Sequence, residues 1–483
     1  MSELVAGNGG RAGLVALVAI LLVGLGLRLA EAWDGRPPVY DAAAYATIAE
    51  RLADGDGFTL GAGATQPASN YSPGLPLLVA GLYELSGGVH VRLARIVLAL
   101  IGALAVLFTY LIGRRLSGPA AGLIGAGAVA IYPALLEYQG MLMGEPLAAT
   151  LLSGAVLAVL WASGAGPGDR RAGPVAGQGP SSSQAAGEDP TPHATRARWL
   201  IPGPLLGALV LVRPEYLGIS VLLAVVVLAW SWDEWRTGLA NVGILLVGVA
   251  LVVAPWTVRN ALVLDRFVPV STGGGQVLFA GSYMPSGGDP ERVGEEVLER
   301  HPGLTRRLAT EYLPRDDFPV KYTGKSSQQL VRPVLARVRL EQILAALAEQ
   351  RYPEMETDEA LGRMGRERLW DDLGERPVEY AGFVTAKVWR AWSRGPRDVM
   401  EEPGWRAFHF ALVALAIVGL GVLIHRRRPE ALLFGVLLLS VTAIVALLVA
   451  SPRRVLVTLP LLAALAGVGT TVLADSLARR WQR

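Results

Sequence analysis

The stretch AGLVALVAILLVGLGLRLAEAWDGRPPVYDAAAY, residues 12–45, decides the fold. Its apolar part, residues 12–32, is long enough to cross a bilayer at about 1.5 Å per residue, so we expect the chain to enter the membrane here. The segment that follows delivers Asp41 to the membrane surface, at the head of a short amphipathic helix predicted from DAAAYATIAERL. A carboxylate at this boundary is the first candidate functional group.

Composition places the chain among membrane proteins. Of its 483 residues, 52% are hydrophobic and 18% are charged, whereas soluble domains have about 25% charged residues. The apolar residues come in long uncharged blocks, which indicates a multi-pass membrane protein. Cysteine is absent, so disulfides and thiolate metal sites are excluded.

The apolar runs predict ten spans, and the basic clusters between them set the orientation. If the spans alternate, clusters such as Arg114-Arg115 and Arg426-Arg427-Arg428 all fall on one side. The positive-inside rule makes that side cytoplasmic and places both termini there. The fifth and sixth segments are short for two crossings. The predicted spans are residues 12–32, 91–113, 118–136, 145–163, 199–212, 216–232, 237–258, 405–424, 430–450 and 455–474.

The same analysis predicts the domain organisation. We expect an N-terminal transmembrane catalytic module at 1–258, an extracytoplasmic domain at 259–404 and a C-terminal three-helix transmembrane segment at 405–483. Within the module, the first outer loop, 33–90, carries interfacial helices, including the apolar run 74–86. Residues 164–198 are rich in Gly, Pro, Ser and Ala, which predicts a disordered cytoplasmic linker. The insert 259–404 contains helical patterns, such as 326–350 and 357–373, and is too long for a structureless loop.

Two acidic residues are candidates for catalysis. Asp41 suits a helix N-cap, and Glu145, in MLMGEPLAATLL, suits the first turn of a helix, so both have a purely structural interpretation. A cap also fixes the orientation of a carboxylate, which a general base requires. Both residues are predicted on the same membrane face, which favours a functional role.

Basic residues are predicted on that face as well, although the positive-inside rule does not require them there. One interpretation is that each extends toward lipid phosphates as an ordinary interfacial anchor. The other is a phosphate clamp, because Arg binds phosphate oxygens through two parallel hydrogen bonds. The histidines show no metal-ligand spacing, so we expect no cofactor; a divalent metal is conceivable but unsupported. The candidates for the clamp are Arg213, Arg259, Arg453 and Arg454.

A set of motifs in this order resembles the GT-C superfamily of polyprenyl-phosphate-sugar-dependent glycosyltransferases. It is most similar to the family 39 type, which includes protein O-mannosyltransferases and the lipid A aminoarabinose transferase. Each motif is loose by itself, but their order and topological placement are specific. The motifs are RLAEAWDGRPPVYDAAAYATIAERLADGDGF (28–58), YSPGLPLLVAGLYELSG (71–87), VRLARIVLAL (91–100), MGEPLAATLL (143–152), LVRPEYLG (211–218), APWTVRNALVLDRFVPVSTGGG (254–275) and SPRRVLVTLP (451–460).

The resemblance implies a fold and a site. The fold is an all-α module of about ten transmembrane helices with interfacial helices in the first outer loop and a small, mainly helical outer domain. Asp41 matches the catalytic Asp of the family, Glu145 matches an acidic position in the second outer loop, and the four Arg match positions associated with the lipid phosphate. Tyr45 and Tyr71 are expected to position the acceptor or the donor. Many relatives carry Asp-Glu where Ala42 follows Asp41 here, so a peptide acceptor is not implied.

The implied activity is an inverting sugar transfer. The donor is a polyprenyl-phosphate sugar, and the acceptor is a hydroxyl of a glycan, lipid or protein on the outer face of the membrane. No nucleic-acid partner is expected. The alternative is a secondary transporter or a lipid-linked sugar flippase, but a transporter is expected to hold ionisable residues at mid-span, whereas here they cluster at the outer ends of the spans. A non-catalytic scaffold would explain the outer domain but not the grouped acids and bases.

Overall fold

The computed structural model describes residues 8–33, 37–61, 67–164, 196–314 and 324–482. Among the described residues, 81% are helical and none lies in a β-strand, which confirms the expected fold class. Most of the predicted linker, residues 165–195, lies outside the described residues. The chain divides into two compact units, each described separately: unit 1 is Met1–Ser271, Gly395–Ser440 and Arg453–Arg483, and unit 2 is Thr272–Arg394 and Val441–Pro452.

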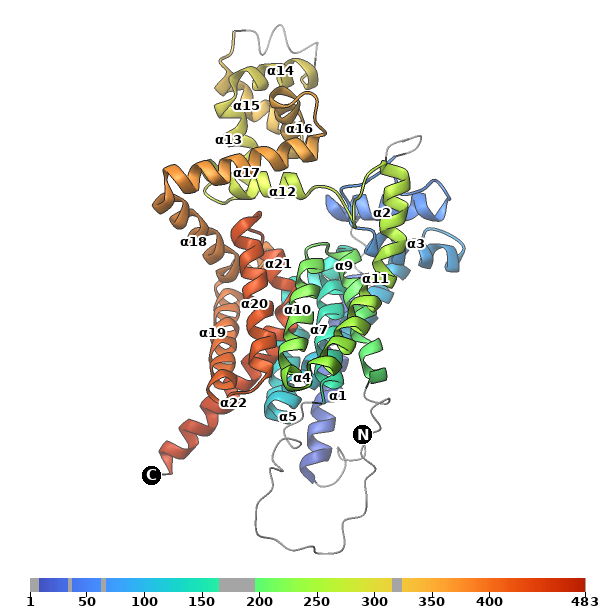
Figure 1. The fold of residues 1–483 in the computed structure, drawn as a ribbon, viewed down its shortest axis with the longest axis vertical. Coiled ribbons are helices and arrows are strands. Elements are labelled where there is room, and N and C mark those ends of the chain that lie inside the picture. Colours follow the sequence, from blue (N-terminus) through green and yellow to red (C-terminus); the bar gives the residue numbers. More distant parts are fainter. Residues whose placement is uncertain (1–7, 34–36, 62–66, 165–195, 315–323, 483) are drawn as a thin grey trace, which may run out of the picture. The chain divides into compact units, whose positions relative to one another are not determined.

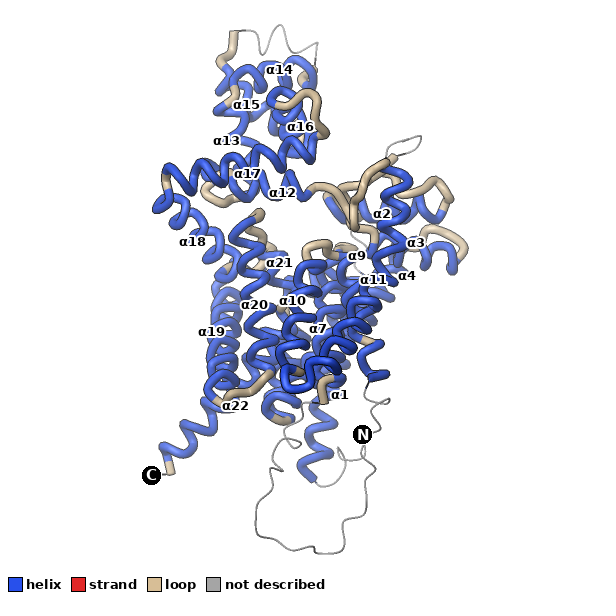
Figure 2. The backbone as a smooth tube through the Cα atoms, viewed as in Figure 1, coloured by secondary structure: helices blue, strands red, loops and turns tan. Residues whose placement is uncertain are grey.

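Unit 1 is a bundle of helices that stand side by side, with two short helices from the first predicted loop at one end (Figures 1 and 2). Its central helices pack in sequence-distant pairs, such as α22 on α5 and α19 on α22. The helices of this unit are α1 Asn8–Trp33, α2 Asp41–Ala53, α3 Gly74–Ser86, α4 Val91–Ser117, α5 Pro119–Ile131, α6 Pro133–Gly140, α7 Gly144–Ala162, η2 Arg198–Leu200, α9 Pro202–Val212, α10 Tyr216–Trp230, η3 Trp232–Glu234, α11 Trp235–Leu264, η7 Asp398–Glu401, α19 Pro403–His425 and α22 Leu459–Trp481, with most of α20 Glu430–Leu447 and α21 Pro452–Val457.

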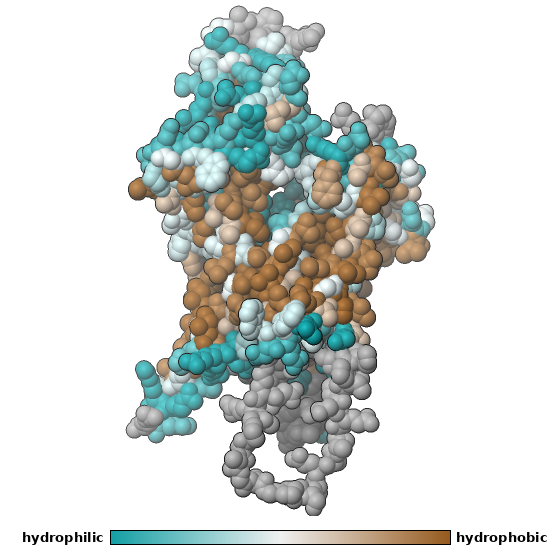
Figure 3. All heavy atoms as spheres, viewed as in Figure 1, coloured by the Kyte–Doolittle hydropathy of each residue, from teal (hydrophilic) through white to brown (hydrophobic). Residues whose placement is uncertain are grey.

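All ten predicted spans are helical, but they differ in length. Seven helices in the described residues are long and apolar enough to cross a membrane, or eight if the bent pair α5 and α6 is one span. Helices α9 and α10 are shorter, so their two crossings remain a prediction. Apolar side chains form a belt over the bundle helices (Figure 3). The chain is therefore a multi-pass membrane protein.

A buried arginine donates hydrogen bonds to carbonyl groups at the bend between α5 and α6. Pro133 starts α6 and has no N–H, so the carbonyl of Val129 loses its helical donor where α5 and α6 bend by 47°. Arg28 of α1, which is 2% exposed, donates to the carbonyls of Val129 at 3.1 Å and Ala130 at 3.3 Å. An intramembrane Arg is a functional candidate by default, but here its partners are backbone carbonyls of a broken helix, which assigns it a structural role.

The first loop folds onto the end of α11. Helices α2 and α3 pack together, and Ile48 and Phe58 form a small core with Trp256 of α11. The indole of Trp256 donates to the carbonyl of Val270 at 2.8 Å, and the buried Asn260 donates to the same carbonyl at 2.9 Å. These contacts fix the segment after α11 against the loop that carries the site.

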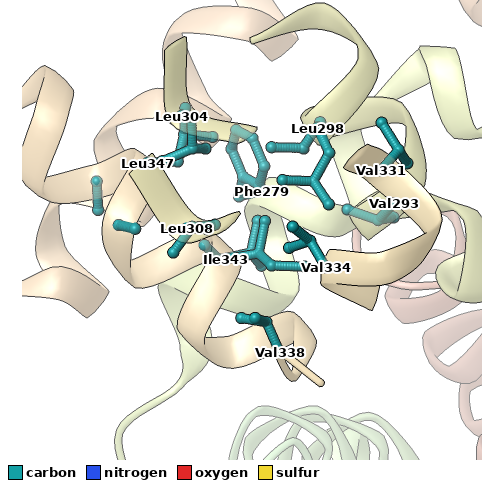
Figure 4. Close-up of a cluster of buried hydrophobic side chains, with 14 of the residues drawn as sticks. Phe279, Val293, Leu298, Leu304, Leu308, Val331, Val334, Val338, Ile343 and Leu347 are labelled. Carbon is teal, nitrogen blue, oxygen red and sulfur yellow. The ribbon is translucent and has the colours of Figure 1, made fainter. Parts of the chain in front are cut away.

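Unit 2 is a helical domain with its own hydrophobic core. Phe279 of α12 lies among side chains from α13, α14, α15 and α16, including Leu298, Leu304, Val334 and Ile343 (Figure 4). The predicted helix 326–350 is two helices, because the backbone N–H of Arg339 is capped by the Gln342 side chain at a new helix start. The helices are α12 Gly274–Ser282, η4 Met284–Ser286, η5 Pro290–Arg292, α13 Val293–Arg300, α14 Pro302–Tyr312, α15 Ser327–Leu335, α16 Leu340–Arg351, α17 Thr357–Glu375 and α18 Pro377–Ser393.

The hydrogen bonds that Arg28 donates at the bend between α5 and α6 predict that substitutions of Arg28 and Pro133 have coupled effects on the free energy of unfolding. Arg28→Met leaves the carbonyl of Val129 without a donor, which costs about 1–3 kcal/mol for a buried group. Pro133→Ala restores an N–H that can donate to Val129, so Arg28→Met should destabilise the Pro133→Ala protein less than the wild type. Thermal unfolding of the two single variants and the double variant in detergent measures this coupling. An equal loss of stability from Arg28→Met in the wild type and in the Pro133→Ala protein would contradict this role of Arg28.

Candidate active site

A row of alternating charges joins four distant segments of unit 1. Arg453 of α21 donates from Nη1 to Oδ2 of Asp41 at 2.8 Å and from Nε to Oε1 of Glu145 at 2.5 Å. Arg213, between α9 and α10, donates to the same Oε1 of Glu145 at 2.5 Å. The row continues through Glu215, which lies 3.9 Å from Arg213 and 3.8 Å from Arg454. Three carboxylates thus alternate with three guanidinium groups.

Glu145 is the centre of this row. It lies in the first turn of α7, where the positive end of the helix dipole favours a carboxylate. Its side chain is 0% exposed, and both arginines bind its Oε1. Its Oε2 is buried and has no hydrogen-bond partner among the described residues. Leu142, just before α7, adopts a left-handed φ of 61° and is buried, so the chain is held in an unfavourable turn at this carboxylate.

Asp41 is the exposed end of the row, and the N-cap interpretation of it was wrong. Asp41 is the first residue of α2; the cap position is Tyr40, with φ 52° and no side-chain cap hydrogen bond. The Asp41 side chain pairs with Arg453, because the carboxylate is directed toward α21 instead of the amides of its own helix. The side chain is 44% exposed, so it is accessible to a reactant.

Two glycines allow Arg213 to reach Glu145. A Cβ on Gly74, the first residue of α3, would lie 2.6 Å from Cγ2 of Val212 and 2.8 Å from its backbone nitrogen. A Cβ on Gly144 would lie 3.3 Å from the other methyl group of Val212. Any side chain on α3 at this contact would push the end of α9 away. The close approach of α3 and α7 to Val212 therefore sets the position of the next residue, Arg213.

The neighbouring arginines stay charged. Burial opposes charge on Arg213, but the carboxylates of Glu145 and Glu215 outweigh it and raise its pKa. Burial also opposes charge on Arg453, and Glu145 and Asp41 together raise its pKa well above the usual value. Both groups are therefore fixed cations, suited to an anionic ligand.

Tyrosines line the same row. Burial raises the pKa of Tyr45 to about 12, with further contributions from the surrounding charges of Arg213, Glu145, Asp41 and Arg453. Its ring meets that of Tyr71 edge to face, with centroids 5.8 Å apart. Tyr45 and Tyr71, which are both predicted to position the acceptor or the donor, are therefore in contact beside the row. The phenol of Tyr45 is neutral and can act as a hydrogen-bond partner.

Arg259 makes different contacts from the arginines of the row. Its guanidinium lies over the rings of Trp256, at 4.8 Å, and Phe58, at 5.7 Å, and donates to Oδ1 of Asn260 at 3.0 Å. The structure records no ion pair from Arg259 to Asp41 or Glu145 in the described residues. The predicted clamp is therefore divided: Arg213, Arg453 and Arg454 are in the row, and Arg259 lies beside the first loop.

The sequence reasoning missed two members of the site. Glu215 lies two residues after Arg213 in RPEY, and this spacing was available as a signal. Tyr138 of α6 lies under Arg453, whose guanidinium carbon is 5.7 Å from the ring centroid. Its contact depends on the bend between α5 and α6, which the local pattern does not specify. No group of three or more His, Cys, Asp or Glu suited to a metal ion occurs in the described part of the chain.

Comparison with known proteins identifies the architecture. Neither a protein-family model nor a curated protein matches the sequence. Among solved structures, the archaeal oligosaccharyltransferase AglB from Archaeoglobus fulgidus, in complex with an inhibitory peptide and a dolichol-phosphate, superposes with a TM-score of 0.52 at 15% identity. Its apo form superposes with a TM-score of 0.55 at 15% identity. These alignments cover 97% of this chain and 51% and 52% of the oligosaccharyltransferase chains.

The chain has a GT-C fold. It spans about half the length of the oligosaccharyltransferase structures it matches. ArnT from Cupriavidus metallidurans, bound to undecaprenyl phosphate, aligns over 96% of this chain and 78% of its own at 16% identity, with a TM-score of 0.37. The resemblance drawn from the motifs is confirmed at the level of this GT-C fold.

The geometry predicts unequal contributions of two carboxylates to stability. Glu145→Gln keeps the shape but removes the charge that compensates two partly buried arginines, so we expect a loss of about 3 kcal/mol, the lower end for broken buried pairs. Glu215→Gln is the matched control, because this carboxylate is 19% exposed and its pairs are long, at 3.9 and 3.8 Å, so they should contribute less than about 1 kcal/mol. Thermal unfolding in detergent compares them. Equal shifts in the two variants would show that Glu145 is not the centre of the row.

Proposed function

We propose that the protein is an inverting glycosyltransferase that moves a sugar from a polyprenyl-phosphate donor to an acceptor hydroxyl. The observation that carries this proposal is the row Asp41–Arg453–Glu145–Arg213 on a GT-C fold. It combines an accessible carboxylate with fixed cations at the ends of apolar helices. The solved AglB complex with a dolichol-phosphate is consistent with a lipid-phosphate ligand for this fold.

Asp41 is the proposed general base. An acceptor hydroxyl is a poor nucleophile, and a carboxylate that takes its proton during attack accelerates the reaction by about 10²–10⁴-fold. The acceptor oxygen forms a bond to the anomeric carbon as the bond from that carbon to the phosphate oxygen breaks. The phosphate leaves with the bonding electrons as a polyprenyl phosphate, and a single displacement inverts the anomeric configuration.

Arg453 and Arg213 are the proposed phosphate ligands. Both are charged, and Arg453 already spans the distance between Asp41 and Glu145. A phosphate that binds Arg453 competes with Asp41 for its Nη1, so donor binding loosens the ion pair that holds the base. Glu145 is the fixed anchor of both arginines, because it is buried and bound by each. Preorganised cations of this kind stabilise charge that develops on a leaving group.

Turnover assays on purified protein with radiolabelled polyprenyl-phosphate sugars test these roles. Asp41→Asn should lower kcat by about 10²-fold while the unfolding temperature stays close to that of the wild type. Asp54→Asn, at the exposed end of the same helix, is the matched control and should have no effect. Near-wild-type turnover of Asp41→Asn would eliminate Asp41 as the base.

Arg453→Lys in the same assay separates binding from chemistry. Lysine keeps the charge but lacks the planar fork, so the KM for the donor should rise roughly tenfold, with a smaller change in the KM for the acceptor. An unchanged donor KM would remove Arg453 from the phosphate site.

We place the site on the extracytoplasmic face. The support is the distribution of arginine clusters, which the positive-inside rule assigns to the cytoplasm. Asp41 and Glu145 lie at the opposite helix ends from the cluster Arg114-Arg115.

The chain has no cysteine, so single cysteines report this orientation directly. An impermeant maleimide added to intact cells should label Glu354→Cys, an exposed position of unit 2, but not Gln482→Cys, an exposed position near the C-terminus. Both should react after permeabilisation. The reverse labelling pattern would place the site on the cytoplasmic face.

A further inference from the structure

A groove lies on unit 1 at the opposite end of α7 from Glu145. Its volume is about 590 Å³, and its lining is mostly apolar. Helix α7 packs against both α4 and α9. It contributes Gly154 and Ala158 to the lining, and the groove is open here because these residues are small. Phe108 and Leu111 of α4 form one wall, and the η2–α9 segment forms the other through Ile201 and Leu205.

The groove is separate from the row of charges. Glu145 is in the first turn of α7, and Ala158 is in its last turns. At about 1.5 Å per residue, these positions are roughly 20 Å apart along the helix axis. Since α7 is a candidate membrane span, the groove lies near one membrane boundary and the row lies near the other. A donor phosphate in the groove would be out of reach of Asp41.

Cations and a tryptophan surround one end of the groove. Arg114 and Arg115 line it, and Trp161 is 44% exposed at its edge. The guanidinium of Arg198 lies 4.9 Å from the centroid of the Trp161 ring. Arg115 faces the carboxylate of Glu430, but neither Arg114 nor Arg198 has a carboxylate partner among the described residues. The rim thus carries two positive charges that no acidic side chain in the described chain compensates.

We propose that this groove binds one anionic phospholipid of the surrounding leaflet. The apolar floor accepts an acyl chain, because a hollow between membrane helices at this depth faces hydrocarbon. The lipid phosphate binds between Arg114 and Arg198, and basic pockets between transmembrane helices are suited to such headgroups. Trp161 lies at the level of the headgroup, as amphipathic aromatic rings do at membrane interfaces. The site is independent of the proposed transfer reaction.

Native mass spectrometry of the full-length protein in detergent tests the proposal. The probes are palmitoyl-oleoyl-phosphatidylglycerol, the matching phosphatidylcholine and undecaprenyl phosphate, each titrated alone. We expect one phosphatidylglycerol to bind at least tenfold more tightly than phosphatidylcholine. The double variant Arg114→Gln/Arg198→Gln should lose roughly 25- to 30-fold in phosphatidylglycerol affinity, since each basic residue near a headgroup contributes about a factor of five.

Two further variants make the result specific. Arg479→Gln/Arg480→Gln removes two exposed charges from the end of α22 and should leave the lipid preference unchanged. Ala158→Phe fills the floor of the groove and should weaken the binding of both phospholipids. Unchanged preference in the Arg114/Arg198 variant, or an equal loss in the tail variant, would overturn the site. Tighter binding of undecaprenyl phosphate than of phosphatidylglycerol, abolished by Ala158→Phe, would overturn the assignment of its ligand.

Discussion

The buried carboxylate of Glu145 is the interaction on which the site depends. A carboxylate with no exposed surface is strongly unfavourable unless charged hydrogen-bond donors compensate it. Arg213 and Arg453 supply that compensation, and in doing so they connect the start of α7 to the α9–α10 turn and to α21. Through Arg453 the same network reaches Asp41, so a buried charge sets the position of an accessible one. The proposed chemistry uses this division: a fixed centre holds the cations, and the exposed end reacts.

Arginines carry three different roles in this molecule, and their partners decide which. Arg28 donates to the carbonyls of Val129 and Ala130 at a proline break, as well as to Gly24 of its own helix, which satisfies a helix that cannot close its own hydrogen bonds inside the membrane. Arg453 meets two carboxylates and is held in one orientation. Arg114 lines an apolar groove and makes no ion pair with a carboxylate among the described residues. The first is structural, the second belongs to the proposed reaction, and the third points to a ligand from outside the protein.

The two ends of α7 show how one helix serves two environments. Its first turn carries the charge that the helix dipole favours and that the neighbouring loops enclose. Its later turns carry small residues, which hold the helix against Phe108 and leave room for a lipid chain. Bulk at Gly154 would move Phe108, because a Cβ there would already lie 3.0 Å from that ring. Small residues in the later turns of α7 therefore allow close packing against Phe108 and also leave space for the groove.

The sequence by itself determined the class of the protein, because long uncharged apolar runs have no soluble alternative and each proved helical. It also identified Asp41, Glu145, Arg213 and Arg453 as charges near the ends of those runs. It did not determine how they pair, since residues 41, 145, 213 and 453 meet only when four elements pack. Local pattern favoured a cap for Asp41, whereas the tertiary contact with Arg453 directs its carboxylate elsewhere. For the same reason the sequence did not identify Glu215 and Tyr138 as members of the site, or show that Arg259 packs on Trp256. The ends of separate helices are positioned by close approaches such as that of Gly74 to Val212, which no local periodicity encodes.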